Sequence, residues 1–138
     1  MIHQMTLTMR THGQGPVEIT DEIRGELRRS KINRGVVTVF CQHTSCSLVM
    51  MENADPSAWS DLQVWLNRLV SEKDPHFQHT LEGPDDMPSH IKMALTRTSE
   101  TLPFSEGELL RGTWQGIFLW EHRRMPHQSS LVLTFMGE

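Results

Sequence analysis

The connections between the predicted strands are the feature that most limits how this chain can fold. After residue 100, short apolar runs are separated by breaks at Gly107, Gly112 and Met125-Pro126, so consecutive strands are only a few residues apart. Parallel strands need a crossover of about a dozen residues or more, whereas antiparallel strands do not. The sequence therefore predicts largely antiparallel sheet, and the helices between the other strands make the class α+β.

The period of the apolar residues predicts seven strands and three helices. Residues 2–10 alternate as in a half-buried strand, and residues 12–16 break it. Asp55-Pro56 starts the clearest helix, because Asp caps free N–H groups and Pro suits the first helical position. The other predicted elements are a short helix capped by Thr20, a third helix over 88–97, and strands over 36–41, 47–51, 101–104, 109–110, 113–122 and 130–136.

Each predicted helix has one apolar face to bury. These faces consist of Ile23 and Leu27 in the first helix, Trp59, Leu62, Leu66 and Leu69 in the second, and Ile91, Ala94 and Leu95 in the third. Residues 71–86 read as a long polar loop, a length that is uncommon unless the loop has a function. A chain of 138 residues with no internal repeat is expected to form one domain over residues 1–138.

Composition and charge exclude several classes of protein. The 13 Lys and Arg residues are outnumbered by 17 Asp and Glu, so nothing points to nucleic acid. No apolar run approaches the ~20 residues that span a bilayer, and the start lacks the pattern of a secretory signal. We therefore expect a cytoplasmic protein with no nucleic-acid or membrane partner. Cys41 and Cys46 are then expected to be free thiols.

Histidine is unusually frequent, with eight copies and no Tyr in the chain. His3, His12, His76 and His127 have no motif around them, and each is expected to be a surface or locally satisfied side chain. His43, His79, His90 and His122 instead fall in polar segments beside predicted strand and helix ends. Imidazole carries protons near neutral pH and is the commonest metal ligand, so these four are candidate site residues.

The segment 42–47 interrupts two apolar strands with polar residues. His43 is a candidate proton carrier or ligand there, and Thr44 and Ser45 are candidate binders of anionic oxygens. The alternative interpretation is a turn whose hydroxyls satisfy backbone groups. His43 and Cys46 also suggest a base and a nucleophile, but no third residue orients the base, so covalent catalysis by Cys46 is disfavoured.

The segment 79–90 holds two histidines and three carboxylates where a loop enters a helix. Imidazole with carboxylate suits zinc or another divalent cation, and the vicinal carboxylates Asp85 and Asp86 suit Mg²⁺ with a polyphosphate. The spacing matches no standard zinc motif such as HExxH. The alternative is that Asp85 and Asp86 cap the helix and that both histidines lie on the surface.

The segment 112–123 reads as a strand with both faces partly buried. Alternation sends Glu121 and His122 to opposite faces, which disfavours a simple dyad of the two. Gly116 would allow close approach of a flat ring or another backbone. Asn53 precedes the helix that begins at Pro56, where an anion can bind.

These segments together resemble the YjbQ family, whose members are catalogued as secondary thiamine-phosphate synthase enzymes. The resemblance covers nearly the whole chain and rests on motifs in the family's order. The motifs are His43-Thr44-Ser45, Glu52-Asn53-Ala54-Asp55-Pro56, Glu82-Gly83 with Asp85-Asp86-Met87-Pro88 and His90-Ile91-Lys92, Gly112-Thr113-Trp114-Gln115-Gly116, Glu121-His122-Arg123 and Gly137-Glu138.

The resemblance implies a YjbQ-like α+β domain that assembles as a homotrimer with its polar motifs gathered into a pocket. It also implies an activity that joins a hydroxymethylpyrimidine diphosphate to a thiazole phosphate and releases pyrophosphate. Trp114 is a candidate to stack on a heteroaromatic ring. The expected roles are catalysis by His43, Glu82, Asp86 and Glu121, substrate binding by Thr44, Ser45, Asn53, Asp85, Trp114 and Gln115, and binding of a divalent metal, zinc or magnesium, by His79, His90 and His122.

The chain departs from the family pattern at two places. Cys46 stands where the family usually has Ala, which argues against a shared cysteine nucleophile. Residues 125–130 lack the family's Gly-Gly-Ser-Arg-Arg, and the loss of two arginines would alter the grip on phosphate. Two alternatives therefore stay open: a metal-dependent hydrolase of a phosphorylated small molecule, and a trimer that binds metal or ligand without catalysis.

Overall fold

Eight strands and three helices make up the computed structural model, which describes residues 1–138. The strands are β1 (Ile2–Arg10), β2 (Gly15–Glu18), β3 (Arg34–Cys41), β4 (Cys46–Glu52), β5 (Ser99–Ser105), β6 (Glu108–Leu109), β7 (Gln115–Glu121) and β8 (Gln128–Gly137). The helices are α1 (Thr20–Ser30), α2 (Pro56–Leu69) and α3 (Asp86–Leu95). The predicted α+β class is confirmed.

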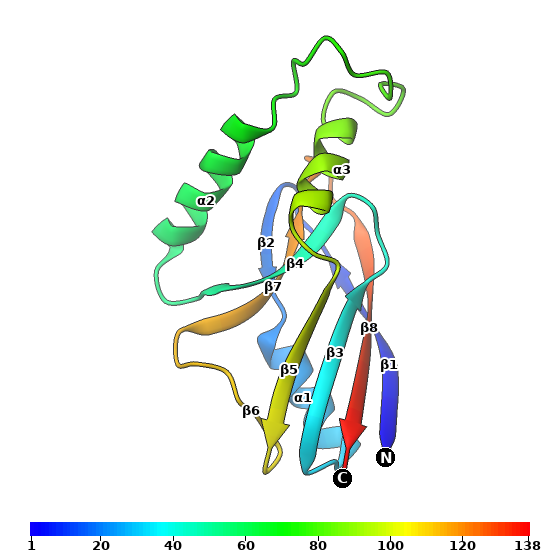
Figure 1. Cartoon of the computed structure of the whole chain (residues 1–138), viewed down its shortest axis with the longest axis vertical. Helices are drawn as coiled ribbons and strands as arrows, with labels where there is room; N and C mark the ends of the chain where they lie inside the picture. The colour runs from blue at the N-terminus through cyan, green and yellow to red at the C-terminus, as the bar shows by residue number, and fades with distance from the viewer.

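The strands form two antiparallel sheets. A five-stranded sheet has the order β1-β8-β3-β5-β6, and a three-stranded sheet has the order β2-β7-β4. The helix α2 stands on the far side of the three-stranded sheet from the five-stranded one, and α3 lies beyond the upper end of β4 (Figure 1). The two chain termini lie together at the opposite end of the five-stranded sheet (Figure 1).

The strand β7 carries apolar side chains on both faces, as alternation predicts. Ile117 and Leu119 belong to the main core, together with residues of the five-stranded sheet and of α1. Phe118 and Trp120 point the other way and pack with Trp59 of α2, with ring centroids 4.9 and 5.0 Å from that of Trp59. The three-stranded sheet is therefore a middle layer that is covered on both faces.

Several sequence-based expectations about local structure are wrong. The side chain of Thr20 does not cap α1; its hydroxyl donates to Glu18 Oε2 at 2.8 Å and accepts from the backbone N of Ile117. The strand β2 begins at Gly15, inside the expected break at 12–16. Ala94 and Leu95 of α3 and Leu69 of α2 are exposed instead of buried.

The ends of the three-stranded sheet position the polar motifs. Cys46 pairs with Glu121 at one end of the β4–β7 ladder, and Glu52 pairs with Gln115 at the other. At ~3.3 Å per residue, six steps along a strand separate these ends by roughly 20 Å. None of the three helices is both long enough and apolar enough to cross a bilayer.

Candidate functional site

Three side chains converge where α3 begins. Asp86 and His90 lie one turn apart on the same face of α3, and His79 comes from the loop before that helix. Asp86 Oδ2 is 2.8 Å from His79 Nε2 and 3.3 Å from His90 Nε2. The donor atoms of all three residues lie within 4.8 Å of one another, so this His79–Asp86–His90 cluster has the size of a metal site.

The hydrogen bonding of His90 directs a lone pair into the cluster. His90 Nδ1 lies 2.6 Å from the carbonyl oxygen of Thr44, and because a carbonyl only accepts, Nδ1 must carry the proton. In the neutral ring Nε2 then presents its lone pair to the Asp86 carboxylate. Such a contact is favourable only if a proton or a metal cation lies between the two atoms. A backbone carbonyl that accepts from the other ring nitrogen is a usual device that orients a ligating imidazole.

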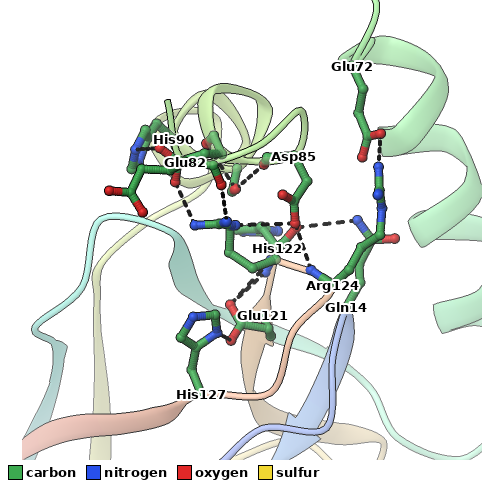
Figure 2. Close-up of polar contacts among 12 residues, drawn as sticks. Gln14, Glu72, Glu82, Asp85, His90, Glu121, His122, Arg124 and His127 are labelled. Atoms are coloured by element: carbon green, nitrogen blue, oxygen red, sulfur yellow. Dashed lines mark hydrogen bonds and ion pairs between the residues drawn. The ribbon is translucent and has the colours of Figure 1, made fainter. Parts of the chain in front are cut away.

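Arg123 orients Asp86 from the opposite side. Its Nη1 donates to Asp86 Oδ1 at 2.8 Å, which leaves Oδ2 for the two histidines. Its Nη2 donates to the carbonyl oxygen of Glu82 at 2.8 Å. Figure 2 shows Glu82, Asp85 and His90 close to one another around the start of α3. Arg123 lies two residues beyond the end of β7, so it links that end of the middle sheet to the cluster.

Asp85 sits at the N-cap position of α3, but its side chain makes no capping hydrogen bond. Its Oδ2 accepts from the backbone N of Arg124 at 2.9 Å and lies 3.2 Å from Arg123 Nε. Burial raises the pKa of Asp85, but the Arg124 hydrogen bond and the Arg123 charge outweigh it and hold the pKa below its usual value. Asp85 is thus an ionised partner of the arginines, and the capping interpretation is wrong for it.

His122 was expected as a metal ligand but lies outside the cluster. It is buried, its Nε2 is 2.9 Å from Ser47 Oγ, and its Nδ1 has no hydrogen-bond partner. Burial, with a smaller contribution from the Lys92 charge, lowers the pKa of His122 to about 3. The ring is therefore neutral at pH 7, and Asp86 takes the place in the cluster that was expected of His122.

Glu121 lies on the opposite face of β7 in a separate buried network. Its carboxylate accepts from Thr11 Oγ1 at 2.8 Å and from the backbone N of His122 at 3.1 Å, and it lies 3.0 Å from His127 Nδ1. Both carboxylate oxygens of Glu121 are thus occupied by other residues of the chain, which indicates a structural role for Glu121. His127, expected to be a surface or locally satisfied residue, is exposed and is one of its partners.

The segment 42–47 contributes mainly through its backbone. The carbonyl of Thr44 holds His90, and the carbonyl of Ser45 accepts from the backbone N of His122 at 3.2 Å. His43 Nε2 accepts from the backbone N of Ser130 at 2.8 Å, so its lone pair is occupied. The expected side-chain roles of Thr44, Ser45 and His43 therefore have no support in these contacts.

Cys41 and Cys46 are free and buried, with their Sγ atoms 3.3 Å apart. Cys46 keeps its proton in the hydrogen bond with Cys41, and this bond and burial together raise the pKa of Cys46. A thiol with a raised pKa is a poor nucleophile, which agrees with the interpretation that Cys46 does not act covalently.

The remaining predicted substrate-binding residues lie at the other end of the three-stranded sheet. Asn53 Nδ2 donates to Glu18 Oε2 at 3.1 Å, and Gln115 is paired with Glu52. Trp114 is 65% exposed. Within one chain the structure brings His79, Asp86 and His90 together, with Asp85 and Glu82 nearby, and leaves Asn53, Trp114 and Gln115 at the other end of the three-stranded sheet.

Three cationic side chains beside the start of α3, those of Arg123, Arg124 and Lys92, have no role predicted by any sequence motif discussed above. The sequence does contain a signal that could have predicted a role for Arg123. A cationic residue follows a buried strand there, and the two vicinal carboxylates Asp85 and Asp86 need a cation. Lys92 is buried on α3, on the face opposite to His90, since two residues turn a helix by about 200°. Burial lowers the pKa of Lys92, and the charge of Asp85 partly offsets that effect.

The fold and the cluster define a small α+β protein with an imidazole–carboxylate site at a helix start. A family model described as UPF0047 protein YjbQ-like matches residues 4–138. The chain is 44% identical to a UPF0047 protein of Synechocystis over 99% of this chain and 92% of that one, and 40% identical to the UPF0047 protein YjbQ of Escherichia coli O157:H7 over the full length of both. The chain therefore belongs to the YjbQ (UPF0047) family.

Solved structures agree with this assignment. A conserved hypothetical protein of Thermus thermophilus superposes with a TM-score of 0.85 at 31% identity, covering 96% of this chain and 99% of that one. A YbjQ-like protein of unknown function from Sulfolobus solfataricus superposes with a TM-score of 0.87 over the full length of both chains. At 20% identity the latter likeness concerns the fold alone.

The buried neutral His122 predicts a pH dependence of stability. Its pKa is about 3 in the folded chain and ~6.5 in the unfolded chain, so below pH 6.5 the unfolded chain binds a proton that the folded chain does not. The free energy of unfolding then falls by up to ~1.4 kcal/mol per pH unit until the pH reaches the folded value. Between pH 7 and pH 5 we expect the unmodified protein to lose about 2 kcal/mol more than His122→Asn in urea unfolding.

The matched control for this measurement is His12→Asn, because His12 is exposed. That variant should keep the pH dependence of the unmodified protein. Equal losses of stability in the unmodified protein and in His122→Asn would show that His122 does not titrate as described.

Proposed function

We propose that this chain is a metal-dependent enzyme that acts on a phosphorylated small molecule, with the divalent ion held by His79, Asp86 and His90. The observation that carries the proposal is the convergence of three donor atoms whose orientation is fixed by partners outside the cluster. Thr44 sets the proton position on His90, and Arg123 sets the free oxygen of Asp86. Residues that only pair ionically do not need both devices.

The donor set favours zinc or a similar transition metal over magnesium. Two imidazoles and one carboxylate suit zinc, whereas magnesium prefers oxygen ligands. The donors fit such an ion in size and chemistry, and three protein ligands are typical of catalytic zinc sites. When bound, the ion would act as a Lewis acid toward phosphate oxygens.

The chain's own residues have distinct parts in this proposal. His79 is 56% exposed in its side chain, so it lies where a substrate enters. Arg123 and Asp85 are positioning residues, because their polar atoms are engaged with the start of α3. Neither needs to touch the substrate, but both determine where the cluster lies.

The specific reaction that we propose is thiamine-phosphate synthesis, in which a thiazole phosphate displaces pyrophosphate from a hydroxymethylpyrimidine diphosphate. The resemblance of the motifs supports it, and the departure of pyrophosphate needs positive charge of the kind that a metal and arginines supply. Hydrolysis of one phosphorylated substrate is the second candidate. It is favoured by the place of Trp114, the candidate platform for a heteroaromatic ring, which lies beside Asn53 at the other end of the three-stranded sheet.

We also propose a homotrimer, supported by an apolar surface that one chain leaves uncovered. Val64, Trp65 and Leu69 of α2 and Leu95 of α3 are each more than half exposed. A hollow of about 350 Å³ lies beside them and is lined mainly by apolar side chains from α2, α3 and the loop between them. Contiguous exposed apolar surface of this kind marks an interaction site.

For the metal site, we expect protein purified without an affinity tag to contain close to one equivalent of a divalent transition metal by elemental analysis. His90→Ala should lose most of it, because removing a ligand weakens binding by at least the ~10-fold seen for second-shell changes. His76→Ala is the control, since His76 is an exposed histidine outside the cluster. Equal and negligible metal in the unmodified protein and in His90→Ala would contradict the proposal.

For the reaction, the protein should be incubated with metal and with the pyrimidine diphosphate and the thiazole phosphate, singly and together. A synthase forms product only when both are present, whereas a hydrolase releases phosphate from one alone. Asp86→Asn should reduce turnover at least ~100-fold, and Asp61→Asn, an exposed substitution on α2, should not. Metal binding without turnover in any combination would leave a metal-binding protein and reject both reactions.

For the assembly, we expect a sedimentation mass three times the 15.9 kDa of one chain. Trp65→Lys should shift the protein toward monomer, because a charge buried in an apolar interface has no partner. Ser60→Lys adds the same charge at an exposed position of α2 and should leave the trimer intact. A monomeric unmodified protein, or a trimeric Trp65→Lys variant, would contradict this assembly.

A further inference from the structure

A second hollow, with a polar lining, lies between α2 and α3, away from the metal cluster. It has a volume of about 230 Å³ and is lined by Gln14, Asn67, Val70, Glu72, Lys92 and Arg124. Lys92 projects from the face of α3 opposite to His90, so the hollow and the cluster lie on different sides of that helix. Figure 2 shows the same separation, with Arg124 and Glu72 on one side of Asp85 and His90 on the other.

The buried ammonium of Lys92 lacks a counterion. Lys92 is only 3% exposed, and its Nζ donates to Asn67 Oδ1 at 2.6 Å. An ammonium has three N–H donors, and no carboxylate lies within ion-pair distance of this one. Asp85 is the carboxylate whose charge acts on the pKa of Lys92, but it already binds Arg123 and the backbone N of Arg124. A buried charge without a counterion destabilises the folded protein unless an anion binds beside it.

A second cation and two amides complete the wall of the hollow. The guanidinium of Arg124 contacts Glu72, and 57% of the Arg124 side chain is exposed. Asn67 Nδ2 donates to Gln14 Oε1 at 3.0 Å, which fixes both amides at the rim. Two cationic side chains therefore face one carboxylate, and the lining carries a net positive charge.

We propose that this hollow binds a phosphate or diphosphate group through Lys92 and Arg124. Its volume is several times the ~30 Å³ that one water occupies, so a tetrahedral anion fits. Lysine supplies a point charge to phosphate, and the guanidinium supplies paired N–H donors that match two phosphate oxygens. Glu72 competes with the ligand for Arg124, so the ligand needs more negative charge than one carboxylate carries. The inference does not rest on the metal site.

The test is calorimetric titration of inorganic phosphate and of pyrophosphate into the full chain, in the presence of a chelator and at low salt. We expect saturable binding of at least one of the two with one site per chain. Lys92→Met should weaken it at least tenfold, and folding should survive because an apolar side chain of similar length replaces a buried charge. Lys73→Met, at an exposed position, is the matched control and should bind like the unmodified protein.

Two rim variants keep the test decisive if Lys92→Met does not fold. Arg124→Gln should weaken phosphate binding, whereas Glu72→Gln should strengthen it, because it removes the competing carboxylate. A purely structural role for the Arg124–Glu72 pair predicts the same sign for both. His90→Ala should bind phosphate like the unmodified protein, which separates this site from the metal cluster. No saturable binding to the unmodified protein, or equal binding by all variants, would overturn the proposal.

Discussion

The ion pairs of Arg123 with Asp85 and Asp86 are the interaction on which the rest of the site depends. Arg123 lies two residues beyond the end of β7. The two carboxylates lie where α3 begins, 37 and 38 residues earlier in the chain. The guanidinium fixes one oxygen of Asp86, so the other oxygen faces His79 and His90. Without this link, nothing else that is charged ties the start of α3 to the middle sheet, and the cluster would lose its geometry.

The same link divides α3 into two faces with different chemistry. Asp86 and His90 face the cluster, whereas Asp85 and Lys92 face the interior and the second hollow. The Asp86 carboxylate and imidazole therefore lie on one side, and the ammonium of Lys92, which has no carboxylate within ion-pair distance, lies on the other. A cation and an anion can then bind on opposite sides of one short helix without competing for the same residues.

The sequence predicted the layers of the fold better than it predicted the site. The prediction that the strand in segment 112–123 has both faces partly buried is confirmed, with Ile117 and Leu119 on one face and Phe118 and Trp120 on the other, because alternation is a local pattern. The strand β2 was missed because Gly15-Pro16 is typical of a turn, although Pro is tolerated in an edge strand such as this one.

The errors at the site came from a boundary and from long-range pairing. Placing the start of the third helix at Pro88 hid the fact that Asp86 and His90 are one turn apart; Pro88 is the third residue of α3, where a missing N–H costs nothing. His122 was predicted to bind the metal because histidine is a common ligand, but its burial depends on the packing of elements that are distant in sequence. Asn53 follows the end of the β4–β7 ladder at which Glu52 pairs with Gln115, and Arg123 follows the other end; this register is contained in no local pattern.

The most direct test of the central claim is an anomalous-scattering map from crystals of the zinc-loaded protein. The account predicts one ordered peak about 2.0 to 2.2 Å from His79 Nε2, His90 Nε2 and Asp86 Oδ2, with His90 Nδ1 still bonded to the Thr44 carbonyl and Arg123 still bonded to Asp86 Oδ1. A peak at His122 or His43, or no ordered peak at the start of α3, would contradict it.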